Sequence, residues 1–279
     1  MAAKVIAVTN QKGGVGKTTV CAGICGCLVA MGKSVLAIDL DPQGNLSFSL
    51  GADGTDDASY TIYNVFKGEV GLYDVIRHTE NCDVACSNIL LSGAELELTS
   101  IGREHILRDQ IDAVKADYDY IIIDTPPALS ILTINAYTAA DWLIIPMMPE
   151  ILSLQGLSQL KETIFAVKKY FNNLLEVRGI LINHYNPRLI LTKEVEELAN
   201  IVAQQLDTDV FETKILKSVT LAEAPAHAKT IVDYAPRSKS AAEFRELTCE
   251  ILGLEKPKRM EKKLGRGRPR KYPRPEDLV

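Results

Sequence analysis

Asn10-Gln11-Lys12-Gly13-Gly14-Val15-Gly16-Lys17-Thr18-Thr19 is the stretch that decides the fold of this chain. It lies between an apolar segment at 4–9, which we expect to be a strand, and an expected helix at 18–31. Its three glycines allow the backbone to turn successive N–H groups toward an anion. The helix that follows presents the positive end of its dipole to the same place. The stretch therefore predicts a phosphate-binding loop between a strand and a helix.

Two side chains of this loop carry the expected chemistry. Lys17 is placed to reach the β- and γ-phosphates of a nucleotide, and the Thr18 hydroxyl is placed to bind Mg²⁺. The loop departs from the general pattern G-x-x-x-x-G-K-[ST], because Gln11 stands where the first glycine would be. A chance glycine-rich turn is the alternative, and the strand–loop–helix context argues against it. The candidate nucleotide-binding residues are Lys12, Gly13, Gly14, Val15, Gly16, Lys17, Thr18 and Thr19.

Two further segments place carboxylates directly after expected strands. Asp39 follows a strand expected at 34–38, and Asp124 follows one expected at 120–123. Because ligands bind at the carboxyl ends of parallel strands, both carboxylates are expected to face the phosphate loop. Together with Thr18 they are the candidate metal residues, for Mg²⁺. The alternatives are a turn or helix cap at Asp39 and a strand that ends in a polar turn at Asp124.

The rest of the chain alternates apolar runs with helical patterns. Strands that are apolar on both faces and separated by helices indicate an α/β protein with a mostly parallel, twisted sheet covered on both faces, as in a P-loop NTPase. We expect one ATPase domain over 1–254, followed by a basic tail over 255–279. The further expected strands are 142–147 and 177–182, and the expected helices are 101–115, 153–171, 191–206 and 241–252.

Composition sets the class of protein. The 279 residues are 47% hydrophobic and 24% charged, which is typical of a globular chain. No apolar run approaches the length of a membrane-spanning helix and the N-terminus lacks a secretory pattern, so we expect a cytoplasmic protein without membrane contact. The six cysteines form no disulfide pattern. We expect Cys21, Cys25 and Cys27 to be small core residues rather than metal ligands.

The net charge of −5 hides an asymmetry. Residues 255–279 carry ten Lys or Arg and four Asp or Glu, a net charge of +6, so the remaining 254 residues carry −11. A basic tail on an acidic body predicts contact with a polyanion. Within the tail, Gly265–Lys271 resembles an AT-hook, whose core is RGRP and which binds the minor groove of A·T-rich DNA. The candidate DNA contacts there are Arg266, Gly267, Arg268 and Arg270, and the alternative is a generic solvated basic tail.

Several motifs together resemble the ParA/Soj-like partition ATPases, within the deviant Walker A, or MinD/ParA, group of P-loop ATPases. They are KGGVGKT in the loop, DPQGN after Leu40, NILLSGAELE at 88–97, LAEAPAH at 221–227 and YAPRS at 234–238. The resemblance implies ATP and Mg²⁺ as cofactors and an ATP-dependent homodimer in which Lys12 crosses to the partner's nucleotide. It also implies that Asp41 orients the attacking water. Lys12, Lys17 and Asp41 are therefore the candidate catalytic residues.

The same resemblance implies partners and further site residues. It implies non-specific DNA binding, association with the nucleoid and a ParB-like centromere-binding protein that stimulates hydrolysis. Asn183 matches a position that contacts the adenine base, while Arg188 and Lys217 match DNA-contact positions. Leu216 and Thr220 depart from the family pattern, which has a proline and an arginine there. The Leu216 departure affects the adenine-side contact. The Thr220 departure leaves the body's DNA surface incomplete, so the tail is expected to compensate.

Two other functions stay open. A MinD-like ATPase that positions membrane or polar machinery would share the loop, although the tail has too few large apolar residues for an amphipathic membrane helix. A DNA-binding regulator would use ATP only as a conformational switch. Lipid co-sedimentation would favour the first, and ATP-dependent DNA binding without stimulated hydrolysis would favour the second.

Overall fold

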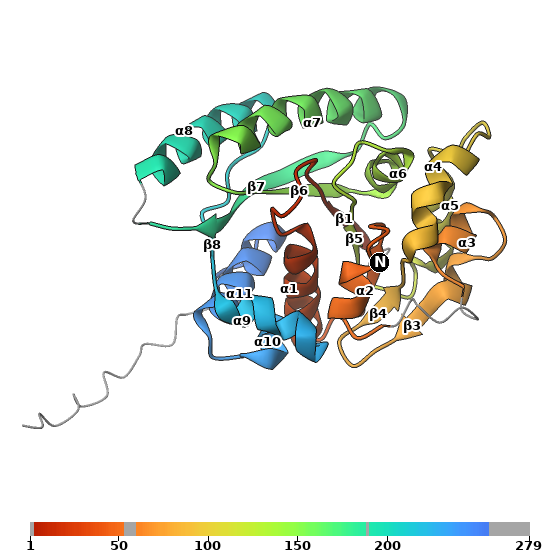
Figure 1. Cartoon of the computed structure of the whole chain (residues 1–279), viewed down its shortest axis with the longest axis horizontal. Helices are drawn as coiled ribbons and strands as arrows, with labels where there is room; N and C mark the ends of the chain where they lie inside the picture. The colour runs from red at the N-terminus through yellow and green to blue at the C-terminus, as the bar shows by residue number, and fades with distance from the viewer. Residues whose placement is uncertain (1–2, 53–59, 188–189, 257–279) are drawn as a thin grey trace, which may run out of the picture.

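One eight-stranded sheet organises the computed structural model, which describes residues 3–52, 60–187 and 190–256 (Figure 1). Its strand order is β3-β4-β2-β5-β1-β6-β7-β8, and every neighbouring pair is parallel except β3 and β4. The strands are β1 (Lys4–Val8), β2 (Val35–Asp39), β3 (Ile76–His78), β4 (Asp83–Ala85), β5 (Tyr120–Asp124), β6 (Trp142–Met147), β7 (Glu176–Tyr185) and β8 (Ile215–Leu216).

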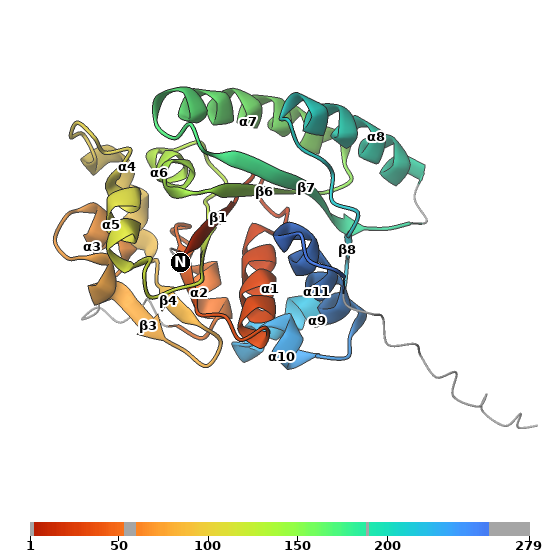
Figure 2. The same cartoon turned by 180° about the vertical axis from the view of Figure 1, so that it is seen from behind.

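Helices cover both faces of this sheet, as Figures 1 and 2 show. One face carries α1 (Lys17–Ala30), α2 (Asn45–Ser49), α10 (Ile231–Tyr234) and α11 (Lys239–Leu252). The other carries α5 (Ile106–Val114), α6 (Ile131–Ala139), α7 (Ile151–Tyr170) and α8 (Ile190–Gln205). The shorter helices are α3 (Ile62–Phe66), α4 (Ala94–Glu97) and α9 (Val219–Glu223), with 3₁₀ turns at Leu72–Val75, Ile89–Gly93 and Ala224–His227. The predicted fold class, a mostly parallel sheet between helical layers, is confirmed.

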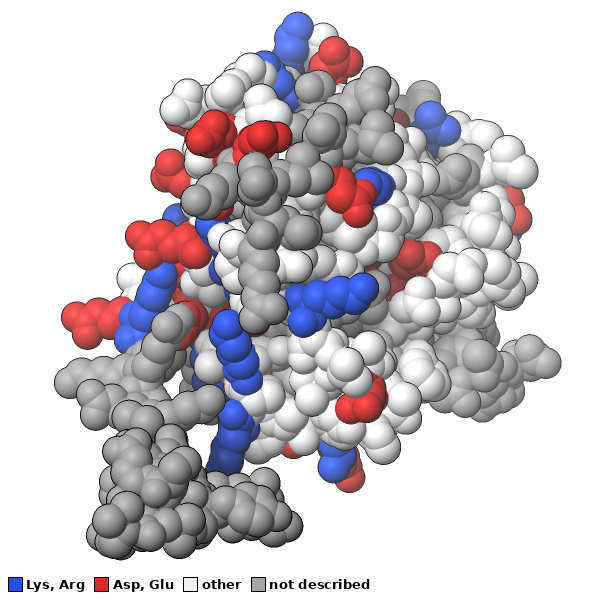
Figure 3. All heavy atoms as spheres, turned by 60° about the vertical axis from the view of Figure 1, so that its left-hand side comes forward, with Lys and Arg blue, Asp and Glu red and all other residues white. Residues whose placement is uncertain are grey.

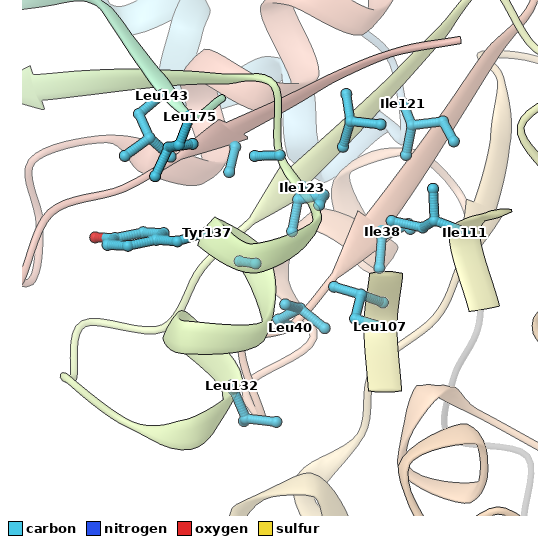
Figure 4. Close-up of a cluster of buried hydrophobic side chains, with 14 of the residues drawn as sticks. Ile38, Leu40, Leu107, Ile111, Ile121, Ile123, Leu132, Tyr137, Leu143 and Leu175 are labelled. Carbon is cyan, nitrogen blue, oxygen red and sulfur yellow. The ribbon is translucent and has the colours of Figure 1, made fainter. Parts of the chain in front are cut away.

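Alternate residues of each central strand pack into two separate hydrophobic cores, one on each face of the sheet. In β5, Ile121 and Ile123 pack toward α5 and α6, whereas Ile122 packs toward α1. Figure 4 shows part of the first core, where Ile38, Leu107 and Ile111 lie near one another. Each such side chain stabilises the fold by about 1.5–3 kcal/mol when fully buried. Burial on both faces is why these strands are continuously apolar.

Some elements differ from the sequence-based expectation. The helix expected at 101–115 begins only at Ile106, because Gly102 has φ +84°, which a right-handed helix cannot accommodate. Strands β3, β4 and β8 are two or three residues long and carry too little periodicity to be predicted. All six cysteines are free and buried, so the expectation of core residues at Cys21, Cys25 and Cys27 is confirmed. In the described part of the chain, no helix is long and apolar enough to cross a membrane.

The packing of α1 on α11 generates the first prediction. A Cβ atom on Gly23 would lie 2.3 Å from two ring atoms of Phe244, which is fully buried. We expect Gly23→Val to lower the free energy of unfolding by about 1–3 kcal/mol, because a filled core cannot take the added volume. Urea denaturation measures this, and Ala30→Val at the exposed end of the same helix is the control. Equal stabilities of the two variants would contradict the close packing.

Candidate functional site

The carboxyl ends of three neighbouring strands bring the predicted polar residues together. Val8, the last residue of β1, pairs with Asp124 at the end of β5, and Asp124 pairs with Asp39 at the end of β2. The phosphate loop follows β1 and leads directly into α1. This edge of the sheet therefore gathers the loop and both carboxylates. Asp124 lies far from the loop in the sequence, so only the parallel pairing makes them neighbours.

The loop holds a conformation that depends on glycine. Gly14 and Gly16 have φ of +76° and +88°, and Gly16 is the N-cap of α1. A Cβ atom on Gly16 would lie 2.2 Å from Asn183 Nδ2. That amide nitrogen donates a hydrogen bond of 2.8 Å to the Val15 carbonyl. Asn183, predicted as a base contact, thus lies buried against the loop.

Lys17 lies in the first turn of α1 with only 7% of its surface exposed. Its Nζ donates to the Lys12 carbonyl at 3.4 Å, which closes the loop around the ammonium group. Burial lowers the pKa of Lys17, while the negative charges of Asp124 and Asp41 raise it. Because the Lys17 ammonium group is poorly hydrated, negative charge in addition to that of Asp124 and Asp41 would stabilise it, and a phosphate group would supply that charge.

Like Asp39, Asp124 is fully buried. Its Oδ2 accepts a 2.6 Å hydrogen bond from Thr18 Oγ1, and its Oδ1 is buried without a hydrogen-bond partner. Burial, followed by the charge of Asp39, raises the pKa of Asp124 to about 8, and the Thr18 bond and Lys17 oppose this shift. An unsatisfied buried carboxylate oxygen beside a hydroxyl fits the hydrated shell of Mg²⁺.

The available ligands also suit Mg²⁺ better than a metal ion that needs three or more protein side chains. Within the described residues, no group of three or more His, Cys, Asp or Glu side chains could by itself hold a metal ion. Mg²⁺ usually keeps several waters and binds through few protein ligands together with substrate phosphates. Thr18, Asp124 and Asp39 match that requirement.

Asp39 is held in place by α2. Its Oδ2 accepts 2.8 Å hydrogen bonds from both the backbone N–H and the hydroxyl of Ser47, and its Oδ1 accepts from the Asp41 N–H. Burial raises the pKa of Asp39 to about 6, and the Ser47 bonds oppose the shift. Asp41 is less buried, and its Oδ1 accepts from the Gln43 N–H at 3.0 Å. Asp41 therefore lies at the open side of the cluster, where its charge acts on Lys17.

Lys12 is bound within its own chain. Its ammonium group forms an ion pair with Glu150, which precedes α7. The Lys12 N–H donates to Asn10 Oδ1 at 3.0 Å, and Asn10 Nδ2 donates to the Pro146 carbonyl at 2.7 Å. Asn10 thus ties the start of the loop to β6.

Sequence reasoning missed Asn10, Ser47 and Glu150 as residues that position the site. Asn10 offered a signal, because a polar residue directly after an apolar strand needs hydrogen-bond partners when it is buried, and the structure buries it. Ser47 and Glu150 offered none, since their partners, Asp39 and Lys12, are brought to them by the tertiary structure.

The predicted DNA contacts are mostly beyond what the structure describes. Lys217 is exposed just after β8, and its charge lowers the pKa of the nearby half-buried His184 after the larger effect of burial. Lys217 therefore lies at the same edge of the sheet as the phosphate loop. The predicted contacts that lie outside the described residues are Arg188, Arg266, Gly267, Arg268 and Arg270.

Comparisons with known proteins agree with this geometry. A family described as AAA domain matches residues 3–177. The sporulation initiation inhibitor protein Soj of Bacillus subtilis is 43% identical over 89% of this chain and 98% of its own. The chromosome partitioning protein ParA of Caulobacter vibrioides is 37% identical over 91% of this chain and 95% of its own.

A solved structure, cobyrinic acid a,c-diamide synthase from Mycobacterium smegmatis with bound ATP analogue and magnesium, is also similar. It superposes with a TM-score of 0.79 and 35% identity, and the match covers 90% of this chain and 94% of that one. The ligands of that structure agree with the ATP and Mg²⁺ predicted from the sequence.

The raised pKa of Asp124 generates the second prediction. The pKa of Asp124 in the folded protein, about 8, exceeds its ordinary value of 3.8. Between about pH 4 and pH 8 the folded state therefore keeps a proton that the unfolded chain has released. The contribution of Asp124 to stability is thus full below this window and falls as pH rises through it. Without Mg²⁺ and nucleotide, we expect Asp124→Asn to melt above the wild type at pH 8–9, by a difference that shrinks as the pH falls toward 4.

Thermal denaturation over this pH range is the measurement, and each kcal/mol corresponds to about 2–4 °C in a chain of this size. The control is Asp112→Asn, because that carboxylate is half exposed. A pH-independent difference between Asp124→Asn and the wild type would contradict the assignment.

Proposed function

Because the chain belongs to the AAA domain family and to its ParA/Soj partition ATPases, we propose that it hydrolyses ATP with Mg²⁺ to segregate DNA. The observation that carries this proposal is the cluster of buried Lys17, buried Asp124 and half-buried Thr18 beneath the glycine loop. A buried cation, a hydroxyl and a carboxylate with one unsatisfied oxygen suit a Mg²⁺-bound phosphate chain and few other ligands.

Each residue of the site then has one task. The N–H groups of the loop and Lys17 bind the phosphates, and Asn183 contacts the base. Thr18 would bind Mg²⁺, and Asp124 and Asp39 would hold it through water. The metal would supply positive charge that offsets the charge of the phosphates. Asp41 orients the attacking water from the open side of the cluster. Catalysis is positioning and electrostatic stabilisation without a covalent intermediate.

ATP would close two copies of the chain face to face. Lys12 would then leave Glu150 and contact the nucleotide of the partner subunit. The ion pair with Glu150 competes with this contact, so closure requires a ligand whose negative charge exceeds that of one carboxylate. A nucleotide shifts the monomer–dimer equilibrium only by its differential affinity for the two states, and the γ-phosphate provides that difference.

The dimer would bind DNA without strong sequence preference, place the protein on the nucleoid and release DNA when a ParB-like partner stimulates hydrolysis. Exposed Lys217 lies at the edge of the sheet that the dimer would present. Residues 255–279, with a net charge of +6, would supply further phosphate contacts and, through Arg266 and Arg268, contacts in the minor groove of A·T-rich DNA.

The third prediction tests catalysis and closure together. Asp41→Ala should bind ATP but lose turnover by about 100-fold or more, because the water loses its orienting carboxylate. It should also form the most stable ATP-dependent dimer, whereas Lys12→Ala should bind ATP and remain largely monomeric. Phosphate release and light scattering with ATP or ADP measure these outcomes.

Lys33→Ala is the control for loss of a lysine outside the site, since Lys33 pairs only loosely with Asp119 on the protein surface. Wild-type turnover by Asp41→Ala would disprove its catalytic role. A dimer of equal stability with ATP and ADP would exclude the switch.

The fourth prediction concerns the tail. Removal of residues 255–279 should leave basal hydrolysis near normal, because every nucleotide motif lies upstream. It should weaken DNA binding severely and reduce the slope of log affinity against log salt by about 0.9 for each DNA phosphate that the tail neutralises. Salt titrations of full-length and truncated protein with ATP measure the slope. Unchanged affinity would show that the folded body, and not the tail, provides the DNA binding.

The double variant Arg266→Ala/Arg268→Ala separates two interpretations of the tail. An AT-hook should lose its preference for A·T-rich over G·C-rich duplex, while a generic basic tail would lose modest affinity equally on both.

A further inference from the structure

A groove lies at the edge of the sheet that is formed by β8, on the side of α11. It is a cavity of about 410 Å³ whose walls include Tyr185 and Leu216 from the strands and Glu243 and Glu246 from α11. Figure 3 views this side of the molecule, where acidic and basic side chains are interleaved on the described surface. The groove is separate from the nucleotide site, since none of the loop residues lines it.

The chain leaves the folded body through this groove. Lys256, the last described residue, lines it, and its Nζ lies 2.7 Å from Glu212 Oε2 and 3.5 Å from Glu250 Oε2. Glu250 is anchored in turn, because its carboxylate accepts the N–H groups of Glu212 and Thr213. The first basic residue of the tail is therefore already bound to an acidic wall that the backbone fixes in place.

The groove carries charges of both signs, with a small excess of carboxylates. Glu212, Glu243 and Glu246 line it and Glu250 adjoins it, while Lys239 lies 3.8 Å from Glu243 and the ammonium group of Lys214 is paired with Glu196 on α8. Beyond Lys256, residues 257–279 carry nine Lys or Arg and three Asp or Glu, a net charge of +6. Residues 258–263 hold four of these basic side chains and lie at most about 25 Å of extended chain from Lys256.

We propose that this groove binds the basic segment 258–263 of the same chain. Lys256 starts the contact, and Lys258, Arg259, Lys262 and Lys263 continue it along the acidic wall of α11. The interaction is electrostatic and partly exposed to solvent, so salt weakens it, with a screening length of about 8 Å at physiological ionic strength. High local concentration offsets the weakness of each ion pair, since the segment is covalently attached next to the groove.

This contact would restrain the tail until DNA competes for the same lysines and arginines. That consequence rests on the proposed function of the tail in DNA binding. The acidic wall and a DNA backbone offer the same chemistry to a basic segment, but a duplex provides far more negative charge. The groove would therefore hold the tail against the body in the absence of DNA and yield it when DNA is present.

Limited trypsin digestion of the full chain, followed by intact mass measurement, tests the contact without DNA. At low salt, cleavage after residues 258–263 should be about five-fold slower in the wild type than in Glu212→Gln/Glu246→Gln, and 0.5 M salt should remove the difference. Cleavage after Arg270 and Lys271 is the internal reference. Glu80→Gln/Asp109→Asn makes the same change of charge away from the groove and should digest like the wild type.

Equal cleavage of the wild type and the groove variant at low salt would overturn the proposal. Circular dichroism confirms that each variant is folded, and the salt comparison in the wild type tests the same contact without any substitution.

A second arm measures affinity for an A·T-rich duplex at low salt. If the groove and DNA compete for 258–263, Glu212→Gln/Glu246→Gln should bind the duplex several-fold more tightly than the wild type, whereas Glu80→Gln/Asp109→Asn should not. If truncation of the tail leaves DNA affinity unchanged while the groove still protects 258–263, the role of the tail in DNA binding fails and the groove contact stands.

Discussion

The hydrogen bond from Thr18 to the buried carboxylate of Asp124 is the interaction on which the rest of the site depends. It fixes the first turn of α1 to the carboxyl end of β5, and Asp124 is in register with Val8 on one side and Asp39 on the other. The phosphate loop can therefore have only one position relative to the two carboxylates. The Asp124 half of the contact is fully buried by the helices and strands that form the core, so the fold and the site share a constraint.

Burial of like charges makes this arrangement costly without a ligand. Asp39 and Asp124 are fully buried neighbours, and burial raises the pKa of each. Lys17 compensates in part, although burial lowers its own pKa. Such a cluster is less stable alone than with a divalent cation and a phosphate chain, which provide the missing charges. The same electrostatic cost that destabilises the empty site is the source of its affinity for a metal–nucleotide complex.

Electrostatic competition recurs at two other places in the molecule. Lys12 is paired with Glu150 in its own chain, and Lys256 is paired with Glu212 and Glu250 at the groove beside β8. Each pair joins a basic residue to a carboxylate of the same subunit. In the proposed function, the same basic residue contacts a polyanion instead. Ion pairs of this exposed kind are individually weak. They can therefore hold a residue in one state and still release it to a nucleotide or to DNA.

The sequence alone determined the fold class and the identity of the main site residues. A glycine loop between a strand and a helix, and carboxylates after apolar strands, have few physical solutions, because parallel strands must place those ends at one edge. The strands β1, β5 and β6 and the long helices α1 and α7 were predictable because they bury continuous or periodic apolar surfaces. The opposite net charges of the body and the tail were likewise evident from the sequence.

Only the tertiary structure decided the contacts that position the site. Asn10 on Pro146, Ser47 on Asp39 and Glu150 on Lys12 join segments whose separation no local pattern encodes. The strands β3, β4 and β8 are too short for their own residues to specify extension, so the hydrogen bonds offered by neighbouring strands decide it. Local sequence thus specifies which groups are present and how each segment folds, whereas long-range packing sets the partner, burial and charge environment of each group.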